Sequence, residues 1–252
     1  MVATGLPGIR SVEQVMGMPI VIDLRDDDAH GEMLQSAFDE FRSVDARFST
    51  YKDASDISRL NRGEMAVSEV HADVQDVLSR CAQLRAATRG YFDVCAASRS
   101  VIDPSGFVKG WSVDRVAGIL SGLGARNFAI NAGGDVIVRG CAHPDDCWRV
   151  GIQHPTLSDK VAAIVVANNL AIATSGAYAR GAHIVDPHTR RAPTGVLSVT
   201  ITGPDLATAD AYATAAFAMG AHGPAWTARL TGYEAMTVLS DQRVLSTPGF
   251  PT

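Results

Sequence analysis

The spacing of hydrophobic residues predicts short strands and amphipathic helices from the start of the chain. Apolar and polar side chains alternate over Met18–Leu24, which is the period of a strand with one buried face. Two later segments repeat apolar residues at helical spacing: Leu34, Ala37, Phe38, Phe41 and Val44, then Val74, Val77, Leu78, Cys81 and Leu84. Asp26–Asp28 offer capping carboxylates to the first helix, and Gly90 is placed to end the second. A third helix is expected to begin near Lys109 and to end before Gly122.

The second half of the chain is richer in predicted strands. They are expected at 127–131, 135–139, 148–153, 161–167 and 197–202, with a closing pair at 234–239 and 243–245. Helices are expected at 207–219 and 225–230. Helices and hairpins mixed in this order favour an α+β fold with mostly antiparallel sheets over a doubly wound parallel sheet. We expect a single domain over residues 1–252.

Composition narrows the class of protein. Hydrophobic residues make up 46% of the 252 residues, enough for a full core, and the net charge is −5 without a basic tract. These values argue against a nucleic-acid binder. The chain has no apolar stretch long enough to span a membrane and no pattern of a secretory signal or lipoprotein leader, so we expect a cytoplasmic location. Its four cysteines lack C-x-x-C spacing and are expected to be free thiols.

Asp210 and Thr214 are the first candidates for chemistry. They lie four residues apart on a predicted helix, so a carboxylate and a hydroxyl share one face. Such oxygens suit a hard cation such as Mg²⁺. The competing interpretation is a surface aspartate and a threonine that bonds back to its own helical turn.

Two glycine-containing loops are further candidates. A loop from Asp103 leads into the helix expected near Lys109, where free N–H groups and a lysine favour an anion such as phosphate. The alternative is an ordinary helix start with Asp103 in a turn. Gly133 and Gly134 either let the backbone approach a ligand or simply permit a tight hairpin.

A fourth candidate combines small hydroxyl residues with a histidine. Thr174 and Ser175 precede Gly176, and His183 follows. His183 is either a general base or a structural residue. A hydrolase triad of Ser175, His183 and Asp186 is disfavoured because no G-x-S-x-G motif surrounds Ser175.

Taken in order, these blocks and several others resemble the ApbE family of Mg²⁺-dependent FAD:protein FMN transferases. The matching strings are Met16–Pro19, Phe48–Tyr51, Ser55–Asn61, Gly90–Val94, Asp103–Asp114, Asn131–Asp135, Thr174–Gly176, His183–Pro187 and Asp210–Thr214. The resemblance extends from about Val15 to Gly220. It implies a compact fold of antiparallel sheets and helices, similar to the T-fold, with FAD in a cleft between its halves.

The resemblance also implies roles for individual residues. Mg²⁺ would be held by the Gly106 carbonyl, the side chains of Asp210 and Thr214, and the Ala213 carbonyl. FAD would be contacted by Met16, Tyr51, Phe92, Asp93, Asp103, Lys109 and Ile184. His183 would be the base that activates the acceptor hydroxyl.

The implied reaction transfers the FMN part of FAD to a Thr or Ser hydroxyl of a partner protein and releases AMP. Only Cys95–Ile102 separates Val94 from Asp103, where relatives usually carry a longer segment. This shortening keeps two alternatives open. One is an FAD pyrophosphatase that gives FMN and AMP, and the other is a flavin-binding module without turnover. A second subunit in a homodimer is a further expected partner, because it would complete the shortened flavin wall.

Overall fold

The central feature of the computed structural model is a sheet of eight strands in which every neighbouring pair is antiparallel. The structure describes residues 8–28, 31–96, 98, 100–143, 146–176 and 184–251. The strand order is β1-β2-β3-β4-β7-β8-β9-β10. The strands are β1 (Ile9–Val15), β2 (Met18–Leu24), β3 (Phe128–Ala132), β4 (Asp135–Arg139), β7 (Leu170–Gly176), β8 (Val196–Gly203), β9 (Glu234–Leu239) and β10 (Val244–Ser246).

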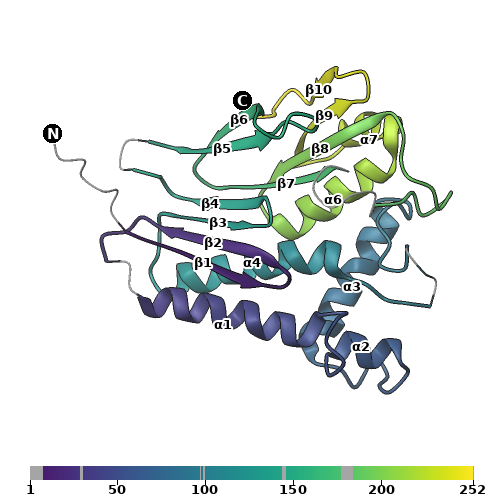
Figure 1. Cartoon of the computed structure of the whole chain (residues 1–252), viewed down its shortest axis with the longest axis horizontal. Helices are drawn as coiled ribbons and strands as arrows, with labels where there is room; N and C mark the ends of the chain where they lie inside the picture. The colour runs from purple at the N-terminus through teal and green to yellow at the C-terminus, as the bar shows by residue number, and fades with distance from the viewer. Residues whose placement is uncertain are drawn as a thin grey trace.

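Helices cover one face of this sheet and a separate hairpin covers part of the other. Successive side chains of β4 point to these two faces in turn. Ile137 packs with the helices, whereas its neighbours Val136 and Val138 pack with Trp148. Trp148 begins β5 (Trp148–Gln153), which pairs with β6 (Val161–Ala167) in a sheet of two strands. Figure 1 shows this hairpin on the opposite side of the strands from helix α1.

The helical layer brings distant segments of the chain together. Its members are α1 (Gly31–Phe48), α2 (Asp56–Asn61), α3 (Ala72–Ala87), α4 (Ser105–Gly122), α6 (Leu206–Ala218), a 3-10 turn (Gly220–His222) and α7 (Gly223–Thr227). α4 packs on α1 and against β3 and β4, whereas α6 lies against β7 and β8. α4 and α6 also pack on each other, so two segments about 100 residues apart in sequence meet over the middle of the sheet.

The predicted fold class is confirmed, as are most of the predicted elements. The predicted strand at 18–24 is β2, and the two early segments with helical spacing form α1 and α3. Gly133 and Gly134, both at positive φ, form the turn of the β3–β4 hairpin. β1, β7 and α2 were not predicted from the sequence. The last helix is also shorter than expected, since α7 covers 223–227 rather than 225–230.

Two local predictions were wrong. Asp26 does not cap α1: its carboxylate instead accepts hydrogen bonds from the backbone N–H groups of Arg126 and Asn127. The third helix begins at Ser105 rather than near Lys109, because the Asp103 carboxylate accepts from the Ser105 N–H and Pro104 occupies the cap position. Lys109 therefore lies in the second turn of α4 and not at its N-terminus.

Within the described residues, none of the helices combines the length and the apolar character needed to cross a bilayer.

Candidate active site

Three charged side chains from three elements converge between the helical layer and the sheet. Lys109 of α4 forms ion pairs with Asp135, the first residue of β4, and with Asp210 of α6, the latter at 3.4 Å between Nζ and Oδ2. Asp135 and Asp210 are 2% and 4% exposed, respectively. Buried carboxylates require charged or hydrogen-bonding partners, so this lysine is part of what allows the two acids to lie here.

Hydroxyl groups extend this charged cluster toward the end of β7. Thr214 is one turn beyond Asp210 on α6, and its Oγ1 lies 3.4 Å from the Ser175 Oγ. The backbone N–H of Thr174 donates to the Asp135 carboxylate at 3.0 Å. The cluster of Lys109, Asp135, Ser175, Asp210 and Thr214 is called the acid–lysine cluster below.

Close packing of α4 on α6 sets the relative positions of Lys109 and Asp210. Gly110 makes this contact possible, because a Cβ atom there would lie 2.5 Å from the Leu206 carbonyl oxygen. One turn later, the Asp114 carboxylate accepts hydrogen bonds from the backbone N–H groups of Leu206 and Ala207 at 2.9 and 2.8 Å. α4 therefore supplies a carboxylate to the first turn of α6, where free N–H groups and the helix dipole favour negative charge.

Burial makes the Asp114 carboxyl group a weaker acid than an exposed aspartate. Burial raises the pKa of Asp114 to about 6, although the two backbone N–H donors act in the opposite direction. The nearby Asp205 carboxylate adds to the rise and Arg139 opposes it. Asp205 itself is the N-cap of α6, where it accepts from the Thr208 N–H.

The donor atoms around Asp210 fit a hard divalent cation. A carboxylate and a hydroxyl one helical turn apart, with a second hydroxyl from Ser175, are the oxygen ligands that Mg²⁺ prefers. Within the described part of the chain, no three or more His, Cys, Asp or Glu side chains form a group that could hold a metal. A cation here would accordingly depend on hydroxyl, carbonyl and phosphate oxygens as well as on Asp210.

Several predicted FAD contacts surround the N-terminal half of α4. Met16 lies in the tight turn between β1 and β2 with φ of 56°, and its sulfur is 3.8 Å from the Ser112 Oγ. Phe92 is buried, and a Cβ placed on Gly106 would lie 3.6 Å from its ring. Gly106 thus lies on the helix that carries Lys109, and Met16 and Phe92 lie beside that helix.

The remaining predicted residues are placed differently. Asp93 pairs with Arg85 at 2.9 Å, Asp103 is exposed at the start of α4, and Ile184 is half-buried against the main core. Tyr51 is 97% exposed. His183 lies outside the described residues, and Ala213 is buried on α6 between Asp210 and Thr214.

Asp135 is the site residue whose role the sequence analysis missed. It stands directly after two glycines and begins a strand, a position that a turn explains without any function. The signal that could have identified it is the acid at the first position of a strand otherwise made of apolar residues, Val136–Val138. Such an acid is expected to be buried, and a buried carboxylate needs a cation or hydrogen-bond donors as partners.

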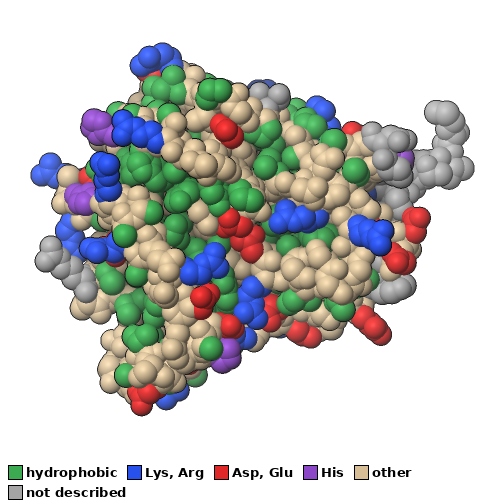
Figure 2. Space-filling model, turned by 180° about the vertical axis from the view of Figure 1, so that it is seen from behind, with side chains coloured by type: hydrophobic (Ala, Val, Ile, Leu, Met, Phe, Trp, Pro, Cys, Tyr) green, Lys and Arg blue, Asp and Glu red, His purple; other side chains and the backbone are tan. Residues whose placement is uncertain are grey.

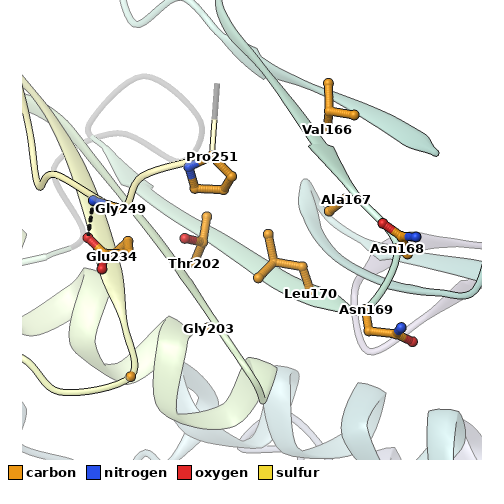
Figure 3. Close-up of a pocket in the computed structure, with 11 residues that line it drawn as sticks. Val166, Ala167, Asn168, Asn169, Leu170, Thr202, Gly203, Glu234, Gly249 and Pro251 are labelled. Carbon is orange, nitrogen blue, oxygen red and sulfur yellow. Dashed lines mark hydrogen bonds between the residues drawn. The ribbon is translucent and has the colours of Figure 1, made fainter.

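A shallow cavity of about 360 Å³ lies elsewhere, between the β6–β7 turn and the C-terminal segment. Figure 3 shows Glu234 at its side, accepting a hydrogen bond from the Gly249 N–H at 3.2 Å. None of the predicted site residues lines it. On the face of the molecule shown in Figure 2, acidic and basic side chains lie next to one another near the centre, bordered by hydrophobic side chains.

Comparison with known proteins identifies one family. The ApbE family model matches residues 16–100 and 95–237. A curated FAD:protein FMN transferase of Haemophilus influenzae is 26% identical over 242 residues, which cover 71% of this chain and 70% of that protein. Another, of Vibrio cholerae, is 36% identical over 129 residues, covering 47% of this chain and 39% of that protein.

Solved structures share the fold. The flavin transferase ApbE from Vibrio cholerae matches with a TM-score of 0.85 at 23% identity, over 96% of this chain and 97% of that one. The apbe protein from Thermotoga maritima matches with a TM-score of 0.86 at 22% identity, over 96% and 97% of the two chains.

Proposed function

Because the chain belongs to the ApbE family, we propose that it transfers the FMN part of FAD to a Thr or Ser hydroxyl of a partner protein. Relatives that bear the name FAD:protein FMN transferase support this activity. The observation that carries the proposal is the convergence of Lys109, Asp135 and Asp210 from α4, β4 and α6, inside the region that the family model matches.

The proposed reaction exchanges the phosphoanhydride bond of FAD for a phosphoester bond on the acceptor. The acceptor hydroxyl oxygen attacks the phosphorus atom of the FMN half of FAD and forms a phosphoester bond. The bond from that phosphorus to the bridging oxygen breaks, and the bridging oxygen leaves as part of AMP. The hydroxyl proton passes to a base. The chain has a net charge of −5, so the pyrophosphate needs a local positive charge. Among the described residues, the Lys109 side chain is positioned to attract it.

Asp210 and Thr214 are the residues that would hold Mg²⁺, together with the carbonyls of Gly106 and Ala213. When bound, the ion neutralises charge on the pyrophosphate and stabilises the charge that develops on the leaving group. Asp210 is buried on α6, and Thr214, one turn away, places its hydroxyl beside Ser175 at the end of β7.

His183 is proposed as the base that takes the hydroxyl proton, on the strength of the family resemblance. A positioned base accelerates such a step by about 10²–10⁴-fold. Met16, Phe92 and the start of α4 would contact FAD, and so would Tyr51, Asp93, Asp103 and Ile184. A His183→Ala variant should still bind FAD, as measured by fluorescence quenching, but should lose transfer; full transfer by this variant would require another base.

The proposal is tested with purified protein, FAD, Mg²⁺ and an acceptor domain that carries the acceptor threonine. We expect AMP release together with flavin fluorescence that stays on the acceptor in a denaturing gel, and EDTA should abolish both. An acceptor with Thr→Val at the acceptor position is the matched control. AMP and free FMN without labelling would instead indicate an FAD pyrophosphatase. Tight FAD binding without either product would indicate a binding module.

A further inference from the structure

A groove of about 430 Å³ lies on the face of the main sheet that the helices leave free. Its floor consists of residues from adjacent strands, among them Val21 and Asp23 of β2 and Ala129 and Asn131 of β3. These residues alternate along each strand, as expected for side chains that share one face of a sheet. The hairpin formed by β5 and β6 borders this floor, and the cavity is called the β5 groove below.

The wall of the β5 groove is the edge of a strand. All six consecutive residues of β5, Trp148–Gln153, line it, whereas β6 contributes none. Successive side chains of a strand point to opposite faces, so a cavity against one face would contact every second residue. Contact with all six residues means that the cavity runs along the edge. Among the described residues β5 pairs only with β6, which leaves this edge available for a further strand.

One end of the β5 groove reaches the acid–lysine cluster. Gly133, Gly134, Asp135 and Thr174 also line the groove. The Asp135 carboxylate accepts from the Thr174 N–H and pairs with Lys109. The groove and the candidate active site thus share Asp135, and a segment lying along β5 would end beside the cluster.

The charges available to a ligand in the β5 groove are positive. Its two carboxylates are engaged, Asp23 with Arg25 at 2.6 Å and Asp135 with Lys109. Arg10 and Arg149 also line the groove and are exposed, and neither has an ion pair with a described residue. The groove therefore favours a ligand that carries negative charge.

We propose that the β5 groove binds an extended, acidic segment of the acceptor protein, which adds as a strand to the free edge of β5 and presents its hydroxyl to the acid–lysine cluster. This inference rests on the proposed function. A free edge supplies backbone hydrogen bonds to any extended segment, and flanking side chains supply the selectivity. Six residues of extended chain span about 20 Å, so the groove suits a short segment rather than a folded surface.

The first test is kinetic and uses the full chain with an acceptor domain that this protein has been shown to label. The variant is Arg10→Glu/Arg149→Glu, and the matched control is Arg229→Glu/Arg243→Glu, which makes the same change of charge at exposed arginines outside the groove. We expect the KM for the acceptor to rise about tenfold or more in the groove variant only, with the KM for FAD and kcat within about twofold. Acceptor variants with lysine in place of acidic residues near the threonine should recover affinity for the groove variant.

An unchanged acceptor KM in the groove variant would overturn the inference while leaving the proposed function intact. Absence of any labelling by the wild-type protein would instead overturn the proposed function, and the inference with it. A rise of equal size in the control variant would show a general effect of charge and would also contradict a specific groove.

The second test measures backbone hydrogen exchange in β5. Added acceptor should slow the exchange of amides within Trp148–Gln153, because new hydrogen bonds form along that edge, and should leave the amides of β6 unchanged. Protection of β5 that grows with enzyme concentration in the absence of acceptor would show that a second copy of the chain occupies the edge. That outcome would overturn the assignment to an acceptor.

Discussion

At the scale of single residues, burial determines the chemical properties of two acids of this protein, Asp210 and Asp114. Asp210 is 4% exposed, so it is not the surface aspartate that its sequence context allowed. Its neighbour Thr214 points its hydroxyl to Ser175 rather than back along its own helix. An acid and a hydroxyl held in this way have lost much of their freedom before any ligand binds, which reduces the entropy cost of binding one.

A cation at Asp210 and Thr214 can be detected without turnover. Mg²⁺ should raise the melting temperature of the wild-type protein, because an ion that binds only the folded state stabilises it. The Thr214→Val variant keeps the side-chain shape but loses the hydroxyl, and we expect its Mg²⁺ affinity to fall about tenfold or more. Thr214→Ser keeps the hydroxyl and is the matched control. Equal Mg²⁺ affinity in the Val and Ser variants, measured by calorimetry, would remove Thr214 from the site.

Asp114 should make stability depend on pH in an unusual direction. In the folded protein burial raises the pKa of Asp114 to about 6, whereas an unfolded aspartate has a pKa of about 3.9. Between these values the folded state binds more protons than the unfolded state. The contribution of this group to the free energy of unfolding therefore falls as pH rises from about 4 to about 6, and then levels off.

An Asp114→Asn variant should lose this dependence while retaining an acceptor for α6. The free energy of unfolding, measured by urea titration at several pH values, should fall less steeply for the variant over the same window. Asp241→Asn is the control: Arg243 lowers the pKa of the exposed Asp241, so any effect of that group is lost on acidification and has the opposite sign. Parallel curves for wild type and Asp114→Asn would contradict the prediction.

At the scale of elements, the contact between α4 and α6 is what assembles the candidate site. α4 carries Lys109 and α6 carries Asp210. The close contact at Gly110 and the hydrogen bond from the Leu206 N–H to the Asp114 carboxylate fix the position of one helix relative to the other. Gly110 lies next to Lys109 in sequence, so a change in the separation of the helices at Gly110 would move the ammonium group relative to Asp210. The geometry of the site thus depends on a residue that has no chemistry of its own.

Gly110→Ala should separate the two helices. The new Cβ would lie 2.5 Å from the backbone carbonyl oxygen of Leu206. A backbone atom cannot rotate out of the way as the end of a flexible side chain can, so one of the two helices must shift. We expect a loss of about 1–3 kcal/mol in the free energy of unfolding. Gly118→Ala is a control on the same helix, where nothing lies within 4 Å of the new Cβ.

Because alanine favours a helix over glycine, Gly118→Ala should stabilise the protein by up to about 1 kcal/mol. Chemical denaturation of both variants measures the difference. A Gly110→Ala variant as stable as Gly118→Ala would show that α4 and α6 can separate without cost.

At the scale of the whole molecule, the protein has two layers on its main sheet that serve different parts of the proposed reaction. The acid–lysine cluster lies between the helical layer and the sheet, and the β5–β6 hairpin forms the wall of the β5 groove on the other face. The hairpin is attached through two small cores. In one, Ile152 and Val165 meet Ile172, Met236 and Phe250, and in the other Trp148 packs on Val136 and Val138. Its placement over the sheet therefore depends on a few apolar contacts.

Adjacent valines of β6 allow this attachment to be tested. Val165 is fully buried and Val166 is 42% exposed on the opposite face. Val165→Ala removes two buried methyl groups and should cost about 2 kcal/mol of unfolding free energy, whereas Val166→Ala should cost less than about 0.5 kcal/mol. Equal losses in thermal or urea unfolding would mean that the hairpin is not held through the face that contains Val165.

Local patterns in the sequence were sufficient to predict most elements and the antiparallel character of the sheet. Alternation over Met18–Leu24 and helical spacing over α1 and α3 record which side of each element is buried, and burial is the largest local constraint on residue choice. β1 and β7 escaped prediction because Ser, Thr, Glu and Gln side chains interrupt their apolar pattern. The spacing of Asp210 and Thr214, and the order of the family's motifs, likewise needed only the sequence.

Only the tertiary structure decided which of these residues meet. Lys109, Asp135 and Asp210 are far apart in sequence, and their convergence depends on the packing of α4 on α6 and on the pairing of β4 with β7. The raised pKa of Asp114 and the free edge of β5 are also invisible in local patterns. Burial, ion pairing and an unpaired edge are properties of contacts between distant segments, and a single sequence records the residues but not those contacts.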